Sequence, residues 1–331
     1  MQILDPIGYP EAIKSVNLSG LKNKSIFVTG GTGFFGIWLL HLISVLNADE
    51  HKINVTLLSR DPQKFLNDNP QYSNVQWLGW VKGDVASYGF PDSKFDLFIH
   101  GAANTKPETV NNQALVFESI VFGTKHVLDH AFFAGAKRLL LISSGAVYGE
   151  VPHGMDFITE DVNTAPLTNK PENAYGEGKR AAEILGYCFA AEKGVEVVTA
   201  RCFAFTGFGI GEHLVLGQLI KQALYSEEII VNGSGLARRS FLHGRDLSVW
   251  LLKLLIDGKA GEIYNVGSDE AYSIAGLAEL VRNELFPGKK VNVLGAQKQE
   301  QRLNYIPSIE KAKTLGLGIW TSLKDAVKEM Q

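Results

Sequence analysis

Residues 29–36 read TGGTGFFG, and this stretch decides the fold because of what flanks it. The apolar run 25–28 comes directly before it, and an apolar stretch with helical periodicity, 37–43, follows. Three of its glycines would allow a tight turn, close approach of the backbone to a phosphate, and close packing of helix on strand. The helix N-terminus would offer unpaired N–H groups and a partial positive charge to phosphates. The stretch therefore predicts a strand, a turn and a helix that bind the pyrophosphate of a dinucleotide.

The composition is that of an ordinary globular chain. Its 331 residues are 45% apolar, which suits one large or two moderate domains. The formal net charge of -3 gives no sustained attraction to nucleic acid or anionic lipid, so we expect neither partner. No run of about 18 apolar residues occurs, and the N-terminal residues lack the apolar core of a signal peptide. We therefore expect no membrane span, no export and a cytoplasmic location.

The two cysteines, Cys188 and Cys202, fall in a predicted helix and a predicted strand. No paired C-x-x-C spacing suggests zinc or redox chemistry, so we expect no metal site. Both cysteines are predicted to be buried small apolar residues in a reducing compartment rather than a disulfide pair.

Up to about residue 201, short β-rich runs alternate with helical patterns, which is typical of a parallel sheet covered on both faces by helices. The predicted strands are 25–29, 53–58, 75–81, 95–100, 138–143 and 195–201, and the predicted helices are 35–47, 112–133 and 174–193. The pattern predicts an α/β fold: a Rossmann-like, doubly wound parallel sheet with its binding crevice at the carboxyl ends of the strands.

Beyond residue 201 the pattern loosens. It predicts a helix near 213–225, a strand at 229–231, a basic turn at Arg238-Arg239, a helix at 246–256, a strand at 262–266 and a helix at 273–285. We expect a dinucleotide-binding domain at 25–202, to which segments at about 240–260 return. Residues 203–331 would mainly form a smaller C-terminal α/β domain that closes over the crevice and binds substrate. Residues 1–24 form an N-terminal extension whose role the sequence does not reveal.

A candidate redox site lies in the second half of the first domain. Ser144 ends the fifth predicted strand, while Tyr175 and Lys179 lie one turn apart on one face of the helix 174–193. A phenol with a pKa of about 10 is a poor acid or base at neutral pH unless a cation stabilises its phenolate. Lys179 would supply that cation, Tyr175 would give a proton to a ketone oxygen that receives hydride from a nicotinamide, and Ser144 would hold the oxygen.

A tyrosine followed by a base four residues later is expected about once by chance in such a chain, so the spacing alone proves nothing. Its place on a helix, after a strand ending in Ser-Ser and downstream of the glycine turn, favours the catalytic interpretation. The same three residues, working in reverse, would oxidise an alcohol.

These motifs together resemble those of the extended short-chain dehydrogenase/reductase family, which includes nucleotide-sugar epimerases, dehydratases and reductases. The resemblance runs from residue 24 to the C-terminus and rests on TGGTGFFG, Gly83-Asp84, HGAA at 100–103, SSGAVYG at 143–149, YGEGK at 175–179, ARCF at 200–203, and RSFLH at 239–243 with Asp246. It implies that cofactor contacts come from Gly30, Thr32, Gly33, Phe34, Phe35, Gly36, Ser59, Arg60, Asp84, Val85, Ala102, Ala103, Tyr175 and Lys179.

The resemblance also implies a nucleoside diphosphate sugar as substrate. Ser144 would contact its sugar, Arg239 would contact its diphosphate, and Arg302 would be a second phosphate ligand; arginine suits this role because its planar fork can hold phosphate oxygens in two directions. Dimerisation through two helices is a habit of the family, so the apolar helices 112–133 and 174–193 suggest a homodimer.

Departures from the family pattern narrow the reaction. Gly145-Ala146 stand where the dehydratases carry Asp-Glu, where the sugar-acid decarboxylases carry Glu at the second position, and where C3/C5 epimerases carry Cys at the second position. By this resemblance those activities lose an acid or base, whereas hydride transfer needs only Ser144, Tyr175 and Lys179. The first interpretation is that the protein is a keto-sugar reductase acting at C4. A 4-epimerase with tightly held NAD is the second, and a non-catalytic cofactor-sensing protein is the third.

The cofactor itself stays open between NADP and NAD. Ser59 and Arg60 stand at the end of the second strand, where an NAD-selective site usually has an acidic residue. Arg60 could bind a 2′-phosphate, or it could simply precede a helix capped by Asp61 with Pro62 at its first position. We lean slightly towards NADP. Ile120 and Ala204 replace asparagines common in relatives, which favours a deoxy or otherwise less polar sugar.

Overall fold

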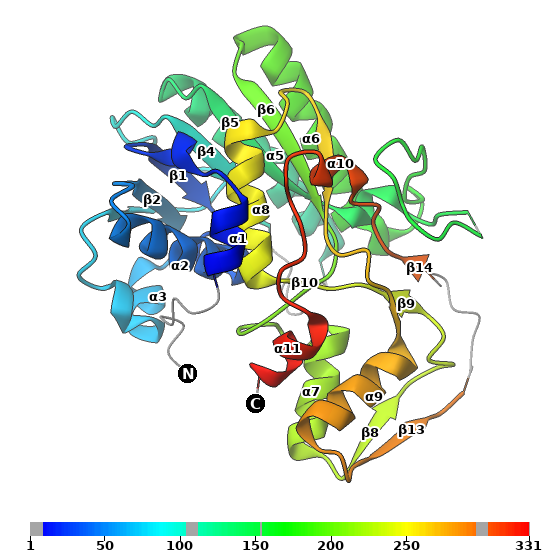
Figure 1. The fold of residues 1–331 in the computed structure, drawn as a ribbon. Coiled ribbons are helices and arrows are strands. Elements are labelled where there is room, and N and C mark those ends of the chain that lie inside the picture. The colour runs from blue at the N-terminus through cyan, green and yellow to red at the C-terminus, as the bar shows by residue number, and fades with distance from the viewer. Residues whose placement is uncertain (1–8, 104–111, 153, 296–303, 331) are drawn as a thin grey trace.

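Seven parallel strands form the central sheet of the protein, for which the computed structural model describes residues 9–103, 112–152, 154–295 and 304–330 (Figure 1). In sheet order they are β11 (Ile263–Val266), β6 (Glu196–Cys202), β5 (Arg138–Ser144), β4 (Leu97–His100), β1 (Ser25–Thr29), β2 (Asn54–Ser59) and β3 (Leu78–Lys82). The chain moves outward from β1 to β3 and then returns to the other side of β1 with β4. A ligand crevice forms at such a reversal, beyond the carboxyl ends of the strands.

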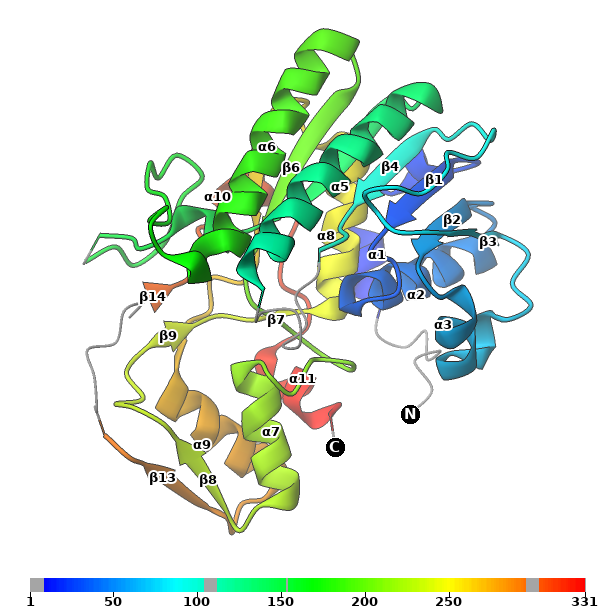
Figure 2. The same cartoon turned by 180° about the vertical axis from the view of Figure 1, so that it is seen from behind.

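Helices cover both faces of this sheet. α2 (Phe34–Ala48) and α8 (Gly244–Asp257) lie on one face, and α5 (Gln113–Phe133) and α6 (Ala174–Lys193) lie on the other, as the two views show (Figures 1 and 2). The predicted doubly wound α/β fold is confirmed. Its strands and helices before residue 202 lie within two residues of the predicted bounds, except that β3 begins at Leu78 rather than at 75, because Leu78 N–H closes a backbone turn onto the Val75 carbonyl oxygen.

A smaller α/β unit lies beyond the carboxyl edge of the sheet. α7 (Val215–Tyr225) and α9 (Ile274–Leu285) pack against the parallel pair β8 (Glu228–Val231) and β13 (Lys290–Val293). Its apolar core includes Leu216, Leu219, Ile229, Leu277 and Val281. The helices and strands predicted here are present. The chain was expected to return to the main sheet at about 240–260. This return extends to residue 266, because β11 pairs with β6.

Arg238 and Arg239 do not form the predicted turn. They form strand β9 (Arg238–Arg239), the middle of a three-stranded sheet between β12 (Tyr272–Ser273) and β14 (Asn304–Tyr305). The prediction was wrong because the backbone partners of β9 lie more than thirty residues away in the chain, beyond the reach of a local pattern.

The N-terminal extension belongs to the main core. Tyr9, Val16, Leu18 and Leu21 are buried together with residues of α8, and the short helix α1 (Pro10–Ser15) lies beside α8 in Figure 1. The hydroxyl oxygens of Tyr9 and Ser248 lie 3.3 Å apart. This segment therefore supports the helix that covers the sheet.

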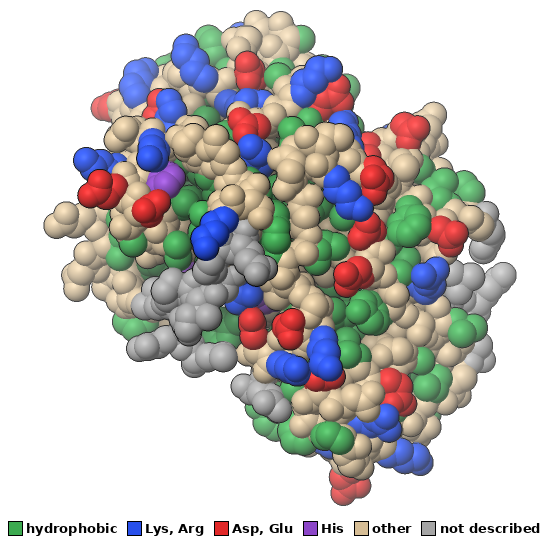
Figure 3. All heavy atoms as spheres, in the orientation of Figure 1, with side chains coloured by type: hydrophobic (Ala, Val, Ile, Leu, Met, Phe, Trp, Pro, Cys, Tyr) green, Lys and Arg blue, Asp and Glu red, His purple; other side chains and the backbone are tan. Residues whose placement is uncertain are grey.

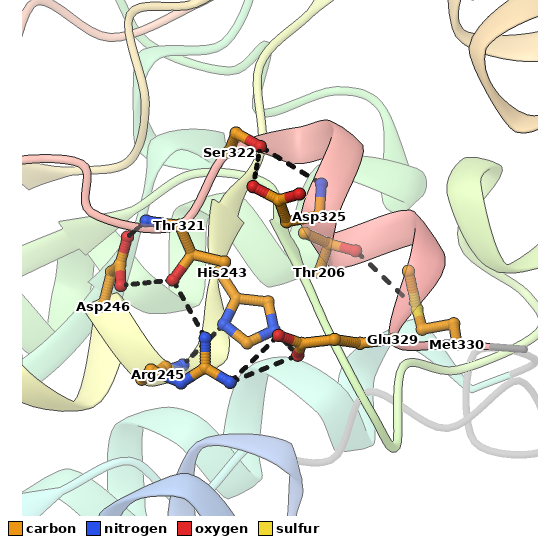
Figure 4. A network of polar contacts seen from close by, with 9 residues as sticks. All are labelled: Thr206, His243, Arg245, Asp246, Thr321, Ser322, Asp325, Glu329 and Met330. Carbon is orange, nitrogen blue, oxygen red and sulfur yellow. Dashed lines mark hydrogen bonds and ion pairs between the residues drawn. The ribbon is translucent and has the colours of Figure 1, made fainter. Parts of the chain in front are cut away.

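The C-terminal helix α11 (Leu323–Lys328) joins the two units through polar contacts at the start of α8 (Figure 4). The Asp246 carboxylate accepts hydrogen bonds from the Thr321 N–H at 2.8 Å and its hydroxyl at 2.9 Å. Arg245 donates to Glu329 at 3.1 Å. The remaining short elements are α3 (Pro62–Asp68), α10 (Glu310–Lys313), and the pair β7 (Phe205–Thr206) and β10 (Leu242–His243).

The surface carries charges of both signs. On the face in Figure 3, the Lys and Arg side chains of the described residues are interspersed with Asp and Glu. Cys188 is exposed, contrary to the prediction that both cysteines are buried, because it falls on the outward side of α6; Cys202 is buried as predicted. Within the described ranges, every helix is too short or too polar to cross a bilayer.

Candidate active site

A cavity of about 1000 Å³ opens at the carboxyl ends of the strands. Its walls come from the glycine turn, the ends of β2 to β6, the first two turns of α6, and residues of the smaller unit. All of the predicted site residues that the structure describes line it: Gly30, Thr32, Gly33, Phe34, Phe35, Gly36, Ser59, Arg60, Asp84, Val85, Ala102, Ala103, Ser144, Tyr175, Lys179 and Arg239. Arg302 lies outside the described residues.

The glycine turn leaves bare backbone at the start of α2. Gly30 has φ +77°, and a Cβ there would lie 2.7 Å from the backbone of Gly101. A Cβ at Gly36 would collide with the carbonyl oxygen of Gly31. Gly33 caps α2 without a side-chain hydrogen bond, so the first amides of the helix stay available to an anion. This cradle fits the pyrophosphate of a dinucleotide.

A buried histidine joins the glycine turn to the end of β4. The Thr124 hydroxyl donates to the Ile120 carbonyl oxygen at 2.7 Å, so it accepts from Nε2 of His100, 3.0 Å away. Nδ1 of His100 must then accept from the Thr29 hydroxyl at 2.7 Å, and that hydroxyl accepts from the Ala102 N–H at 3.2 Å. Burial lowers the pKa of His100 to about 3, so the ring stays neutral and the tautomer is fixed.

Ser144, Tyr175 and Lys179 come together as the sequence predicts. Burial raises the pKa of Tyr175, against the opposing effect of a hydrogen bond with Ser144. Nζ of Lys179 lies 6.0 Å from the centre of the Tyr175 ring and donates to the carbonyl oxygen of Ile142 at 2.8 Å. Burial lowers the pKa of Lys179 to about 8, so Lys179 is charged in most molecules at neutral pH.

Charged residues of both signs line the cavity beyond the end of β2. Arg60 lines the cavity, and so does Lys64, which sequence reasoning missed. The carboxylate of Asp61 accepts the N–H of Lys64 at 3.0 Å and thereby caps α3, as predicted. Capping α3 and lining the cavity are therefore compatible roles for this segment. The Asp61 cap places Lys64 in the first turn of α3, but that pattern does not show that the side chain reaches the cavity.

Aromatic side chains line the cavity beside Gly145, which follows Ser144, and one of them, Tyr305, was also missed. Tyr305 lies directly across from Arg239 in the pairing of β14 with β9. Its ring centre lies 4.7 Å from that of Phe203 and 5.9 Å from the Arg239 guanidinium carbon. A Cβ at Gly145 would approach the Tyr305 hydroxyl. No local pattern marks Tyr305, because all of these neighbours are distant in sequence.

Two phenylalanines of the glycine turn also contact the smaller unit. The ring centre of Phe205 in β7 lies 4.6 Å from that of Phe34, in a stacked arrangement, and 4.8 Å from that of Phe35, edge to face. Among the described residues, no three His, Cys, Asp or Glu side chains gather in a way that could hold a metal ion.

Known proteins resemble this chain in sequence and in fold. The sequence model of the NAD dependent epimerase/dehydratase family matches residues 26–267. UDP-glucuronic acid decarboxylase 1 of Xenopus tropicalis is 32% identical over 310 residues, which cover 90% of this chain and 69% of the relative.

Solved structures share the fold over nearly the whole chain. UDP-N-acetylglucosamine 4-epimerase from Methanobrevibacter ruminantium M1 has a TM-score of 0.80 at 21% identity, covering 93% of this chain and 97% of that one. RMD from Pseudomonas aeruginosa complexed with NADPH has a TM-score of 0.75 at 24% identity, with coverage of 93% and 97%. With the glycine cradle and the Ser144, Tyr175 and Lys179 cluster in one cavity, these matches show that the chain belongs to the NAD dependent epimerase/dehydratase family.

Proposed function

We propose that the protein is an NAD(P)-dependent oxidoreductase that transfers hydride at C4 of a nucleoside diphosphate sugar, acting as a 4-keto-sugar reductase. The proposal rests on the positions of the carboxylates that line the cavity. Among the described residues that line the cavity, the acids are Asp61, Asp68 and Asp84. Asp84 follows β3, four strands from the β5 end that carries Ser144, a separation of roughly 19 Å at the usual strand spacing. Proton transfer beside Ser144 thus falls to Tyr175.

Crowding at Gly145 supports the same conclusion. A Cβ added there would lie within 3.0 Å of the Phe203 ring and would run into the Tyr305 hydroxyl. A side chain at the position where dehydratases of the family carry Asp would therefore require Tyr305 and Phe203 to shift. Ala146 likewise offers no acid where the decarboxylases carry Glu. The named activity of the Xenopus tropicalis relative is for this reason not the one we assign to this chain.

The geometry gives each catalytic residue a task. When bound, a nicotinamide dinucleotide supplies or accepts the hydride. Tyr175 carries its proton at neutral pH because burial raises its pKa, so its phenol can donate to the oxygen of a ketone that is being reduced. The Lys179 ammonium stabilises the phenolate that remains. The Ser144 hydroxyl holds the substrate oxygen in place.

Arg60 favours NADP over NAD. It lines the cavity beyond the end of β2, where its guanidinium could hold a 2′-phosphate. Lys64 lines the same corner and is ion-paired with Asp68 at 3.4 Å, while one oxygen of Asp61 accepts the Lys64 N–H. The solved structure of RMD contains NADPH, which agrees with this choice without deciding it.

Substrate binding is assigned to the opposite side of the cavity. Arg239 would hold the diphosphate, and Ser144 the sugar oxygen. Phe203, Ala204 and Phe241 give this side an apolar character that suits a deoxy or otherwise less polar sugar. Arg302 is still proposed as a second phosphate ligand, and this proposal rests on the sequence alone.

We also propose that two copies of the chain associate through α5 and α6. Phe122 on α5 and Ile184 on α6 are each 60% exposed, which is unusual for large apolar side chains on two helices that pack together. Covering them with a second copy would remove this apolar area from water.

Activity and cofactor content together test the proposal. Turnover of UDP-, dTDP-, GDP- and CDP-linked 4-keto sugars is measured with NADPH and with NADH, using the wild type and Tyr175→Phe. Loss of turnover in Tyr175→Phe with unchanged cofactor affinity is expected; full activity of this variant would refute the mechanism. A 4-epimerase, which the same three residues could also serve, would instead release stoichiometric NAD on denaturation and interconvert 4-hydroxy epimers without added cofactor.

A further inference from the structure

A buried carboxylate lies beneath the catalytic residues, on the same helix. Glu183 follows Lys179 by four residues, as Lys179 follows Tyr175, so the three occupy one side of α6 over successive turns. Glu183 is only 5% exposed. Nothing in the proposed reaction uses it, although a buried charge needs a reason to be there.

Glu183 joins α6 to two strands at once. Its carboxylate accepts from the hydroxyl of Ser143 at 2.5 Å, and from Nε and Nη2 of Arg201 at 3.0 Å and 2.7 Å. Ser143 and Arg201 are direct neighbours across the β5–β6 pairing. Each lies one residue before the strand end, where Ser144 and Cys202 line the cavity. This two-pronged, charge-assisted arrangement fixes the position of α6 along both strands.

The Arg201 side of the contact is equally enclosed. The Arg201 guanidinium carbon lies 4.7 Å from the ring centre of Tyr148, whose hydroxyl donates to Asn265 at 2.7 Å. Burial would lower the pKa of Arg201, but its bonds to Glu183 outweigh burial and raise it, so the guanidinium stays charged. Breaking such a pair on one side leaves an uncompensated buried charge.

The charges around Lys179 point to a second role. His100 on β4 is neutral, because burial lowers its pKa to about 3, and Cys202 on β6 is a neutral thiol, because burial raises its pKa to about 12. Tyr175 on α6 carries its proton. Cys202 and Glu183 both work against the lowering of the Lys179 pKa by burial. Of the two, Glu183 is a carboxylate, ion-paired with Arg201 on β6.

We propose that Glu183 is a positioning residue that acts through Lys179: it holds α6 against β5 and β6 and keeps the Lys179 side chain charged at working pH. This inference builds on the catalytic role proposed for Lys179. It assigns a task to a residue that touches neither substrate nor cofactor.

The test is the pH at which Lys179 loses its proton. Glu183→Gln keeps the shape of the side chain and removes its charge. Because a neighbouring negative charge favours the ammonium, its loss should move the deprotonation of Lys179 towards lower pH by roughly one unit. The alkaline limb of the pH–rate profile should shift by the same amount, with turnover near pH 6 little changed. Glu183→Asp, which retains the charge, should keep the wild-type limb.

A matched control removes a carboxylate from the same helix. Glu177 is ion-paired with Arg180 at 3.8 Å and is not part of the cavity wall, so Glu177→Gln should leave the alkaline limb where it is. If Glu183→Gln lowers the rate equally at every pH, Glu183 is merely structural and the proposal is wrong. If the single variant does not fold, the paired variant E183Q/R201M avoids the unpaired guanidinium; because it also removes a cation, a smaller downward shift is expected.

Competitive labelling with acetic anhydride, read for Lys179 by mass spectrometry across pH, needs no turnover. It therefore separates this inference from the proposed reaction. A downward shift of the Lys179 labelling curve in Glu183→Gln would support the inference even if no sugar nucleotide were reduced. An unmoved curve in an active enzyme would overturn the inference and leave the reaction standing.

Discussion

The hydroxyl of Thr29 lies 2.7 Å from Nδ1 of His100, and this contact ties the end of β1 to the end of β4 at the reversal of strand order. Gly30 follows the first of these residues, and Gly101 and Ala102 follow the second. The two loops, which line the cavity, are thus joined beneath by this side-chain contact as well as by the backbone bond from the Gly101 N–H to the Thr29 carbonyl oxygen at 3.1 Å.

Thr29→Val should weaken cofactor binding. The change keeps the β-branched shape but removes the bonds to His100 and to the Ala102 N–H, so the two loops stay joined only through the backbone. The dissociation constant of NAD(P), measured by calorimetry, should rise about tenfold, as expected for one or two neutral hydrogen bonds. Thr56→Val on β2, outside the cavity wall, is the control and should bind like the wild type. Equal affinity in all three proteins would contradict this role of Thr29.

The free energy of unfolding should decrease at acid pH because of His100. Its folded pKa is about 3 and its ordinary value 6.5, so between these pH values the unfolded chain takes up a proton that the folded protein refuses. This contribution is present above pH 6.5 and is lost as pH falls, by about 1.4 kcal/mol per pH unit. Urea unfolding between pH 6 and 4 should show a shallower dependence in His100→Gln than in the wild type. Substituting the exposed His213 by Asn should not change the slope.

Arg60→Ala should discriminate between the two cofactors. If Arg60 holds a 2′-phosphate, its removal costs a charge-assisted hydrogen bond, and the dissociation constant of NADP should rise about 10- to 100-fold. Affinity for NAD, which lacks the phosphate, should stay within twofold. Lys22→Ala, at an exposed position, serves as the charge control. A parallel loss for both cofactors would mean that Arg60 only shapes the loop.

The double variant F122D/I184D should yield monomers. A charge in the centre of an apolar contact between copies would have to be desolvated, so association should be lost. Sedimentation velocity should show a wild-type dimer and a folded monomeric variant. Tyr225→Asp, on the exposed end of α7, is the comparison and should stay dimeric. A monomeric wild type would remove the proposal.

The dinucleotide half of the molecule could be predicted because its signals are local. TGGTGFFG stands between its own strand and helix, and Tyr175 and Lys179 share one helical turn. Every predicted cofactor contact and catalytic residue accordingly lines one cavity. Their chemical roles, like the cytoplasmic location and the homodimer, stay predictions.

The substrate half was harder because its contacts are not local. β9 and β14 have two residues each and are strands only through partners elsewhere in the chain, so Arg238-Arg239 suggested a turn and Tyr305 suggested nothing. Glu183 and Lys64 were missed for a related reason. Each is an ordinary charged helical residue by sequence, and only the fold shows what its side chain meets.

Tyr305 can reach its place beside β9 only late in synthesis, because it lies near the end of the sequence. The glycine cradle, Ser144, Tyr175 and Lys179 all precede residue 202, so a nascent chain of that length already carries most of the residues that face a dinucleotide. Tyr305 is made about a hundred residues later and pairs with β9 only after it leaves the ribosome. The strand pairing that places Tyr305 opposite Arg239 can therefore form only after the last tenth of the chain has begun to emerge, long after the residues of the glycine turn have been made.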